Sequence, residues 1–336
     1  MSIAPVIFGC AGTVLSNEER EFFASVNPYG FILFERNISN PGQVWRLTQE
    51  LRETVVHPAV PILVDQEGGR VVRLRPPQWS KIPSARRLVS GVAEDQEVAC
   101  HAIRLNSHLI ACDLIATGIS VSCMPVLDLV SSRGHKVIGD RAYSANPFEV
   151  ARYGRAACQG LLECGVLPVI KHIPGHGRAT LDSHLALPRI DAKIEELVRT
   201  DFVPFRELRE MPIAMTAHIL FSAVDPVFPV TLSPTMVSRV IRDLIGFDGL
   251  LVTDDISMSA LTGTLGYRAR KALNAGCDLV LHCNGILSEM EEIAIAVHPM
   301  SAATHDRAAQ CASLCTQKPS GIDFAADRRE LNKLLT

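Results

Sequence analysis

Residues 166–184 read VLPVIKHIPGHGRATLDSH. The first five positions are apolar without interruption, which is typical of a strand buried on both faces of a parallel sheet. The run ends in Lys171 and His172, and the segment after it carries proline and glycine at positions that exclude a regular helix. The stretch therefore predicts a buried strand that ends in polar side chains and continues into a long irregular loop.

Seven other short runs rich in β-branched and apolar residues recur along the chain: VIFGC (6–10), FILF (31–34), PILVD (61–65), ISVSCMPVLD (119–128), IAMTAH (213–218), GLLVTD (249–254) and LVLHC (279–283). Segments with helical periodicity separate the runs. Three of these segments open with an N-cap side chain followed by proline, at Asn40, Asn146 and Ser233. Glycines stand where such helices should end, at Gly165, Gly246 and Gly276. The alternation predicts parallel βαβ units.

Eight strands in βαβ units can close into a (β/α)8 barrel, and a chain of this length is ordinary for that fold. An open doubly wound sheet is the competing architecture. However, no G-x-G-x-x-G motif follows the first strand, and the runs stop at eight. We therefore expect an α/β protein with a single TIM-type barrel domain over 1–336, in which the core covers about 6–300 and extra C-terminal helices form a tail over 301–336.

Composition argues against several classes of protein. The 336 residues are 47% hydrophobic and carry a net charge of −3, which disfavours nucleic acid or an anionic membrane as a partner. No apolar run is long enough to span a bilayer, and the first residues, MSIAPVIFGCAG, lack the regions of a signal peptide. We expect a soluble cytoplasmic protein. Its ten cysteines should be buried reduced thiols, because several of them lie inside apolar runs.

Polar side chains end most of the predicted strands, and barrel enzymes place their chemistry at these ends. Any single polar residue there could be a turn former, but charged or imidazole groups end six of the eight runs and together indicate a site. They are Asp65, Asp128, Lys171 with His172, His218, Asp254 with Asp255, and His282. The loops over 66–92, 129–146 and 173–190 are also long, and long ordered loops in a compact domain are commonly functional.

Two chemistries at the end of the fifth strand can be argued against. His172 and His176 have the spacing of a zinc-binding helix, but Pro174 and the neighbouring glycines forbid that helix. We therefore expect no metal, and nothing else in the sequence calls for a cofactor. Lys171 could form a Schiff base, as in barrel aldolases. Neighbouring carboxylates would keep it charged, however, and a charged lysine is better suited to hydrogen-bonding hydroxyl groups.

A third possibility concerns Asp182-Ser183-His184 on the loop after the same strand. In an extended segment, residues two apart point to the same side, so the carboxylate can hold the imidazole Nδ1–H and leave Nε2 available. This is the arrangement of a poised general acid/base. A D-x-H triplet alone usually has no function. Its position after a strand that ends in Lys-His favours the acid/base interpretation here.

Five segments resemble glycoside hydrolase family 3: DQEGGRVVR (65–73), GDRAYSANP (139–147), KHIPGHG with DSH (171–184), TAH (216–218) and TDDISM (253–258). The likeness is strongest to the branch of bacterial cytosolic β-N-acetylhexosaminidases of peptidoglycan recycling. Ile173 departs from the family's usual phenylalanine. We expect this change to be neutral, because it alters the packing of the loop but no polar group.

The resemblance implies a retaining exo-β-N-acetylglucosaminidase that removes terminal N-acetylglucosamine from GlcNAc-anhydroMurNAc-peptides (muropeptides). Asp254 would be the nucleophile of a covalent intermediate, with His184 as the general acid/base and Asp182 tuning it. The sugar would be held by Asp65, Arg73, Arg141, Lys171 and His172. Asp255 is expected to be structural. The loop 173–184 is expected to swing in, because its glycines and small residues leave it little to pack against.

Three other functions stay open. A β-glucosidase of the same family usually carries a second domain and places its acid/base elsewhere, so the chain length and the Asp182/His184 pair disfavour it. A β-glycoside phosphorylase would use phosphate in place of water, and a histidine acid/base does not repel that anion. A barrel that only binds sugars would not need the nucleophile and the Asp-His pair. Trp45 and Trp79 could lie in the core or form a platform for the leaving group.

Overall fold

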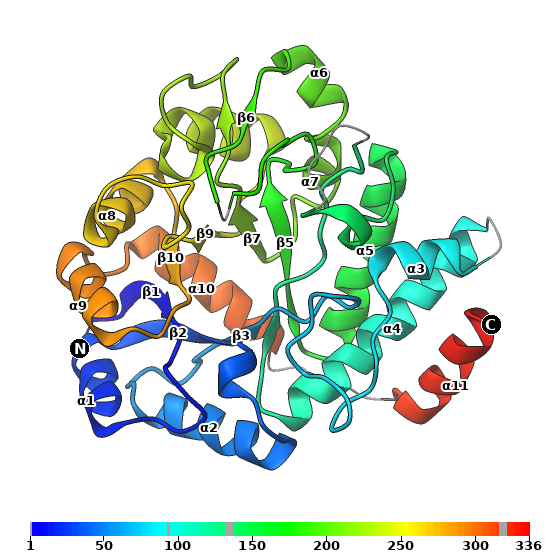
Figure 1. Ribbon diagram of the computed structural model, residues 1–336, viewed down its shortest axis with the longest axis horizontal. Helices are drawn as coiled ribbons and strands as arrows, with labels where there is room; N and C mark the ends of the chain where they lie inside the picture. The colour runs from blue at the N-terminus through cyan, green and yellow to red at the C-terminus, as the bar shows by residue number, and fades with distance from the viewer. Residues whose placement is uncertain (1, 93–94, 132–136, 184, 316–320) are drawn as a thin grey trace.

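The structure is a computed structural model that describes residues 2–92, 95–131, 137–183, 185–315 and 321–336. Eight parallel strands close into a barrel in the order β1-β10-β9-β7-β5-β4-β3-β2, and helices surround them (Figure 1). The predicted α/β barrel is thus confirmed over the open sheet. Its strands are β1 (Ala4–Phe8), β2 (Pro28–Leu33), β3 (Ile62–Val64), β4 (Val121–Ser122), β5 (Leu167–Ile173), β7 (Ile213–Thr216), β9 (Leu250–Asp255) and β10 (Leu279–His282).

Helices follow most of the strands. They are α1 (Asn17–Val26), α2 (Pro41–Glu53), α3 (Ala85–Ser90), α4 (Gln96–Ala116), α5 (Pro147–Glu163), α6 (Ile194–Arg199), α7 (Val203–Glu207), the π-helix η4 (Met236–Ile245), α8 (Leu265–Ala275), α9 (Leu287–Ala296), α10 (Ala302–Cys315) and α11 (Phe324–Leu334). Short 3₁₀ turns are η1 (Glu35–Asn37), η2 (Gly139–Arg141) and η3 (Val230–Leu232). A separate two-stranded sheet joins β6 (Arg189–Ile190) to β8 (Leu220–Phe221).

Four of the six predicted helix boundaries are confirmed as made. Of the other two, Ser233 accepts the backbone N–H of Met236 at 3.1 Å but lies two residues before the N-cap of η4, Thr235, and Gly165 follows the C-cap of α5, Cys164. The Asn40 side chain accepts the backbone N–H of Gln43 at the start of α2, and the Asn146 side chain accepts that of Phe148 at the start of α5. Gly246 and Gly276 end η4 and α8 in the left-handed conformation, with φ of 79° and 106°, which a residue without Cβ adopts at little cost.

Two apolar layers hold the barrel together. An outer layer lies between the strands and the helices, while an interior cluster fills the barrel itself. The interior cluster includes Ile7, Tyr29, Ile32, Leu63, Val121, Cys123, Leu167, Val169, Ile213, Met215, Leu250, Val252, Leu279, Leu281 and Cys283. Since side chains alternate along a strand, every barrel strand except the two-residue β4 supplies both layers.

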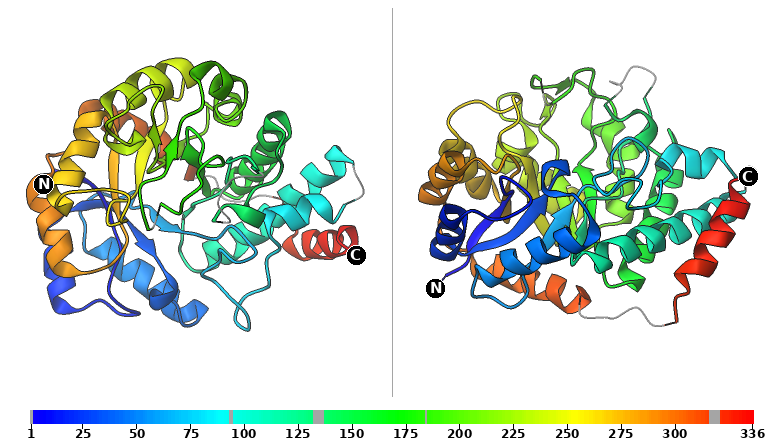
Figure 2. Two further views of the ribbon diagram at one scale, coloured as in Figure 1. Left: turned by 45° about the horizontal axis from the view of Figure 1, so that its top comes forward. Right: turned by 60° about the horizontal axis from the view of Figure 1, so that its bottom comes forward.

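The two helices at the C-terminal end of the chain occupy different places (Figure 2). Residues of α10 join the interior cluster, and the Cys311 thiol donates to the carbonyl of Pro212, which precedes β7. Helix α11 instead packs along α4. His108 of α4 lies with Nδ1 2.7 Å from Asp327 of α11 and Nε2 2.9 Å from Glu163 of α5. One imidazole thus joins three helices.

All ten cysteines are free thiols, seven of them buried, so the prediction of reduced thiols is confirmed. Burial raises the pKa of most of them, for example Cys164 to about 12, and such thiols are poor nucleophiles. None of the described helices is both long enough and apolar enough to cross a membrane.

Candidate active site

A pocket of about 340 Å³ opens at the carboxyl ends of the barrel strands. Its volume lies at the lower end of the range for small-molecule sites, about 300–1,000 Å³. Charged and apolar groups line it together: Ile32, Phe34, Arg36, Asp65, Glu67, Arg70, Val71, Arg73, Val137, Arg141, Lys171, His172, Met215, Asp254, Asp255, Met258, Leu281, Cys283 and Asn284.

Strand alternation explains why three of the charged residues reach this pocket. In β3, β5 and β9, the residues two positions before Asp65, Lys171 and Asp254 belong to the interior cluster. Side chains two apart in a strand share a face, so these three residues continue the interior rows at the barrel mouth. The next layer of the barrel is therefore polar.

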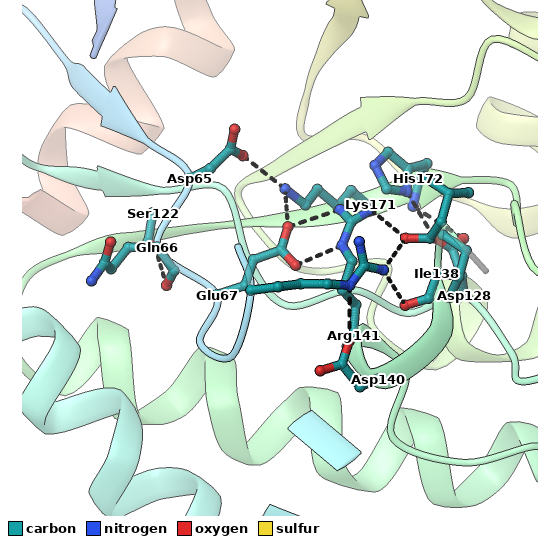
Figure 3. Close-up of polar contacts among 12 residues, drawn as sticks. Asp65, Gln66, Glu67, Ser122, Asp128, Ile138, Asp140, Arg141, Lys171 and His172 are labelled. Atoms are coloured by element: carbon teal, nitrogen blue, oxygen red, sulfur yellow. Dashed lines mark hydrogen bonds and ion pairs between the residues drawn. The ribbon is translucent and has the colours of Figure 1, made fainter. Parts of the chain in front are cut away.

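Lys171 stands at the centre of a buried ion network (Figure 3). Its Nζ donates to Asp65 Oδ1 at 2.9 Å and lies 2.6 Å from Glu67 Oε1. Arg73 Nη2 donates to Asp65 Oδ2 at 3.0 Å, and Arg141 donates to both carboxylate oxygens of Glu67, at 2.9 and 2.8 Å. Cations and anions alternate through the network, so each buried charge has a partner of opposite sign.

The network fixes the protonation of its members. Burial by itself raises the pKa of Asp65, but Lys171 and Arg73 outweigh burial and hold that pKa below its usual value. Arg141 and Lys171 likewise hold the pKa of Glu67 well below its usual range against the effect of burial. For Lys171, burial lowers the pKa, yet Asp65 and Glu67 raise it above the ordinary value. Lys171 is therefore a charged hydrogen-bond donor, which disfavours a Schiff base.

His172 is held by a second buried carboxylate, Asp128. The ring Nδ1 donates to Asp128 Oδ2 at 2.7 Å, and Asp128 Oδ1 accepts the backbone N–H of His172 at 3.3 Å and that of His176 at 2.6 Å. Burial raises the pKa of Asp128, but His172 more than compensates and lowers it overall. The carboxylate orients the ring so that Nε2 lies on the side away from Asp128.

The two adjacent carboxylates at the end of β9 have different surroundings. Both residues line the pocket, and Asp254 Oδ1 accepts the backbone N–H of Asp255 at 2.8 Å. The Asp255 carboxylate accepts the backbone N–H and the hydroxyl of Ser257, at 3.0 and 2.7 Å, and the N–H of Cys283 at 3.3 Å. These bonds connect β9 to β10 and to the following turn, as expected of a structural carboxylate.

The first half of the loop after β5 is packed. Gly177 lies so close to Leu129 that an added Cβ would approach its carbonyl oxygen to 2.2 Å. Arg178 Nε donates to Asp201 at 2.6 Å. The expectation that glycines leave this loop little to pack against is therefore wrong for residues 174–179, because the absence of a Cβ here permits close backbone contact. Ile173 itself is fully buried in the outer core.

The second half of the loop carries Asp182 and Ser183, whereas His184 lies outside the described residues. The Asp182 carbonyl accepts the backbone N–H groups of Leu185 and Ala186 at 3.0 and 3.1 Å. Asp182 is not among the described residues that line the pocket. The structure brings six predicted residues into one pocket, namely Asp65, Arg73, Arg141, Lys171, His172 and Asp254. Their roles, and those of Asp182 and His184, stay predictions.

Sequence reasoning missed Glu67 and the Phe34 wall of the pocket. Glu67 stands two residues after Asp65 in DQEGG, and that proximity was the available signal. The guanidinium groups of Arg36 and Arg73 lie 5.3 and 5.2 Å from the centre of the Phe34 ring, within cation–π range.

Other candidates lie outside the pocket. Trp79 belongs to the outer core, and Trp45 is 51% exposed on α2, so neither forms a platform at this pocket. His218 bonds to Thr231 and His282 to Glu289. Among the described residues, no group of three or more His, Cys, Asp or Glu side chains is arranged to hold a metal ion.

Comparisons with known proteins identify similar sequences over most of the chain. Residues 10–311 match the family described as glycosyl hydrolase family 3 N terminal domain. A beta-hexosaminidase of Alkalilimnicola ehrlichii is 39% identical over 289 residues, covering 84% of this chain and 82% of that protein. One of Methylococcus capsulatus is 39% identical over 282 residues, with 83% and 82% covered.

Solved structures are also similar to this chain. NagZ from Neisseria gonorrhoeae, in complex with N-trifluoroacetyl-D-glucosamine, superposes with a TM-score of 0.88 at 31% identity, over 100% of this chain and 99% of that chain. A family 3 β-N-acetylglucosaminidase from Paenibacillus sp. superposes with a TM-score of 0.84 at 31% identity, over 98% of this chain and 66% of that one.

Proposed function

Because the chain belongs to glycosyl hydrolase family 3, we propose that it is a retaining exo-β-N-acetylglucosaminidase. The substrate class is peptidoglycan fragments, GlcNAc-anhydroMurNAc-peptides, from which it releases terminal N-acetylglucosamine in cytoplasmic cell-wall recycling. The observation that carries the proposal is the placing of the Asp254 carboxylate in the same pocket as the network around Lys171. Relatives named beta-hexosaminidase and a neighbour solved with a glucosamine derivative support the choice of sugar.

Asp254 is the nucleophile in this proposal. Its carboxylate attacks the anomeric carbon, the bond from that carbon to the leaving oxygen breaks, and a covalent glycosyl ester forms. A charged lysine and four arginines line the same pocket, and nearby cations favour the ionised carboxylate that this step needs. Met215 and Leu281 supply an apolar part of the pocket lining.

His184 is the proposed general acid/base, with Asp182 as its partner. In the first step the imidazolium gives its proton to the departing oxygen. In the second step the neutral imidazole takes a proton from water, which attacks the anomeric carbon and releases Asp254. An imidazole with an ordinary pKa of about 6.5 can serve in both directions near neutral pH.

Five charged or imidazole side chains are proposed to bind the sugar: Asp65, Arg73, Arg141, Lys171 and His172. The carboxylate accepts hydrogen bonds from sugar hydroxyls, while the arginines and the lysine donate them. Hydrogen bonds to charged groups contribute about 1.5–3 kcal/mol each. Their pairing with one another and with Glu67 and Asp128 keeps them in place before the sugar arrives. This reduces the reorganisation that binding requires.

A trapping experiment tests the nucleophile. A 2-fluoro sugar with an activated leaving group should add a single glycosyl mass to the wild-type protein, detected by intact mass spectrometry. Asp254→Ala should give no adduct, and Asp255→Ala, which alters the neighbouring carboxylate, should still give one. An adduct on Asp254→Ala would refute the assignment.

Two further assays separate the proposal from its alternatives. Turnover of an aryl N-acetyl-β-glucosaminide should exceed that of the aryl β-glucoside, whereas a β-glucosidase would show the reverse. Turnover should not depend on added phosphate, and the product should be the free sugar. A sugar phosphate as the main product would establish a phosphorylase instead.

A further inference from the structure

Ser183 is a buried residue in the second half of the loop after β5. It is 3% exposed, although Leu181 before it and Leu185 after it are exposed. Its hydroxyl lies 3.2 Å from Nε2 of His176. Its carbonyl accepts the backbone N–H of Ala260 at 3.2 Å, and Ala260 belongs to the segment that follows β9. Ser183 is therefore tied to the ends of two strands, β5 and β9.

His176 is a buried neutral imidazole. Burial lowers its pKa to about 4, and the attraction of Asp128 only partly offsets this. Within the described part of the chain, its Nδ1 is buried and has no hydrogen-bond partner. A neutral ring carries one proton, and an unpaired buried N–H is rarer than an unpaired acceptor. The proton therefore resides on Nε2, which donates to the Ser183 hydroxyl.

Asp128 connects His176 to the sugar pocket. One carboxylate oxygen accepts the backbone N–H of His176 at 2.6 Å, and the other accepts Nδ1 of His172 at 2.7 Å. The rings of His172 and His176 also pack edge to face, with centroids 5.6 Å apart. His172 lines the pocket, whereas His176 does not. A continuous chain of contacts thus leads from the pocket through Asp128 and His176 to Ser183.

We propose that His176 is a positioning residue for glycoside cleavage, and that it acts through its bond to Ser183. Ser183 stands between Asp182 and His184 in the sequence, so its contacts near the ends of β5 and β9 restrain the backbone that joins the two proposed partners. The inference rests on the proposed function, in which this stretch carries the acid/base. His176 is assigned neither to the sugar nor to proton transfer.

A positioning role for His176 predicts a selective kinetic effect that a purely structural role does not predict. A displaced acid lowers kcat/KM, which reports the first step, only when the leaving group needs a proton, while loss of folded protein lowers it equally for every substrate. Ser183→Ala should lower kcat/KM for an N-acetylglucosaminyl disaccharide by about 2- to 13-fold, the factor that corresponds to the 0.5–1.5 kcal/mol of a single hydrogen bond. The kcat/KM for a 2,4-dinitrophenyl N-acetyl-β-glucosaminide should change by less than about twofold.

His176 variants and a control complete the test. The amide of His176→Gln can reach Ser183 from the place of Nε2 and should retain most of the disaccharide activity, whereas the shorter His176→Asn should behave like Ser183→Ala. Thr180→Ala removes a hydroxyl from an exposed position in the same loop and should leave both substrates unaffected. Thermal melting verifies the fold of each variant. If His176→Asn does not fold, Ser183→Ala decides alone.

His184→Ala separates the two levels of inference. If it slows the disaccharide selectively while Ser183→Ala and His176→Asn behave like Thr180→Ala, the positioning role is refuted and the proposed function stands. Equal losses on both substrates in the Ser183 and His176 variants also refute the positioning role. If His184→Ala itself shows no selectivity, the acid/base assignment fails, and the positioning role fails with it.

Discussion

Glu67→Gln changes one atom in the buried ion network and should have a large effect. Glu67 accepts from Arg141 through both carboxylate oxygens and lies 2.6 Å from Lys171. Its side chain is only 7% exposed. Glutamine has nearly the same shape, so no cavity forms. The substitution removes the negative charge that compensates two cations and directs an N–H₂ group toward one of them.

The magnitude follows from the burial of these charges. Removing one partner of a buried ion pair costs about 3–5 kcal/mol. Unfolding entropies of about 2.1 cal/mol/K per residue give about 0.7 kcal/mol/K for a chain of this length, so the melting temperature should fall by about 4–7 °C. Glu35→Gln is the matched control, because Glu35 also pairs with an arginine, at 2.7 Å, but is 66% exposed. Its effect should be less than about 1.5 °C.

The pH dependence gives a second measurement on the same variants. The folded-state pKa of Glu67 lies well below its usual value, because Arg141 and Lys171 outweigh burial. A depressed carboxyl pKa stabilises the fold above the unfolded pKa, about 4.3, and this stabilisation is lost as the pH falls further. Glutamine does not titrate. The difference in unfolding free energy between wild type and Glu67→Gln should be constant from pH 8 to about 5.5 and should shrink below about pH 4.5.

Differential scanning calorimetry across this pH range checks both expectations. Equal melting shifts for Glu67→Gln and Glu35→Gln would show that burial of the charges does not decide their contribution. A gap that widened as the pH fell would contradict the ionised, cation-bound state of Glu67. Either result would refute the reasoning about the network.

Three more predictions concern other parts of the fold. Asp128→Asn should raise KM for an aryl glycoside about tenfold, because the amide cannot accept from both the ring and the backbone of His172 as the carboxylate does. Steady-state kinetics measures this, and an unchanged KM would contradict the prediction. Gly177→Ala should lower the melting temperature by several degrees or prevent folding, whereas Gly12→Ala, with no atom closer than 4.0 Å, should be neutral in the same scan. His108→Gln should speed tryptic cleavage at Arg328 and Arg329 of α11 about tenfold, because the ring contacts carboxylates of both α5 and α11. Equal cleavage rates would show that the ring does not secure α11.

The sequence predicted the barrel because its signals are local. Each strand is an apolar run bounded by turn residues. The N-cap asparagines of α2 and α5 directly precede the proline that begins each helix. The fourth run, 119–128, shows where this reasoning stops. It forms regular strand only at Val121–Ser122, because Pro125 has no N–H to continue a ladder. The following residues still approach β5, through the bridge between Val126 and Lys171.

The parts of the site that sequence reasoning missed depend on tertiary contacts. The role of Glu67 depends on its partner Arg141, which lies 74 positions away on a different long loop. Likewise, the sequence alone suggests that Gly177 makes its loop flexible. The backbone of Leu129, which lies against Gly177, is remote in the sequence. Composition and spacing do not predict such contacts between distant segments. The inward direction of Asp65 and Asp254, by contrast, follows from the alternation of side chains along each strand.

The pairing of the first barrel strand with the last has a consequence for biosynthesis. Strand β1 hydrogen-bonds to β10, with Val6 opposite Val280, so the ring cannot close until nearly the whole chain has left the ribosome. Until then an apolar N-terminal strand presents an unsatisfied edge, which is a target for chaperones and for aggregation. Residues on β3, β5 and β9 meet only in the closed ring, so the return of enzymatic activity during refolding should report the final annealing of β1 to β10.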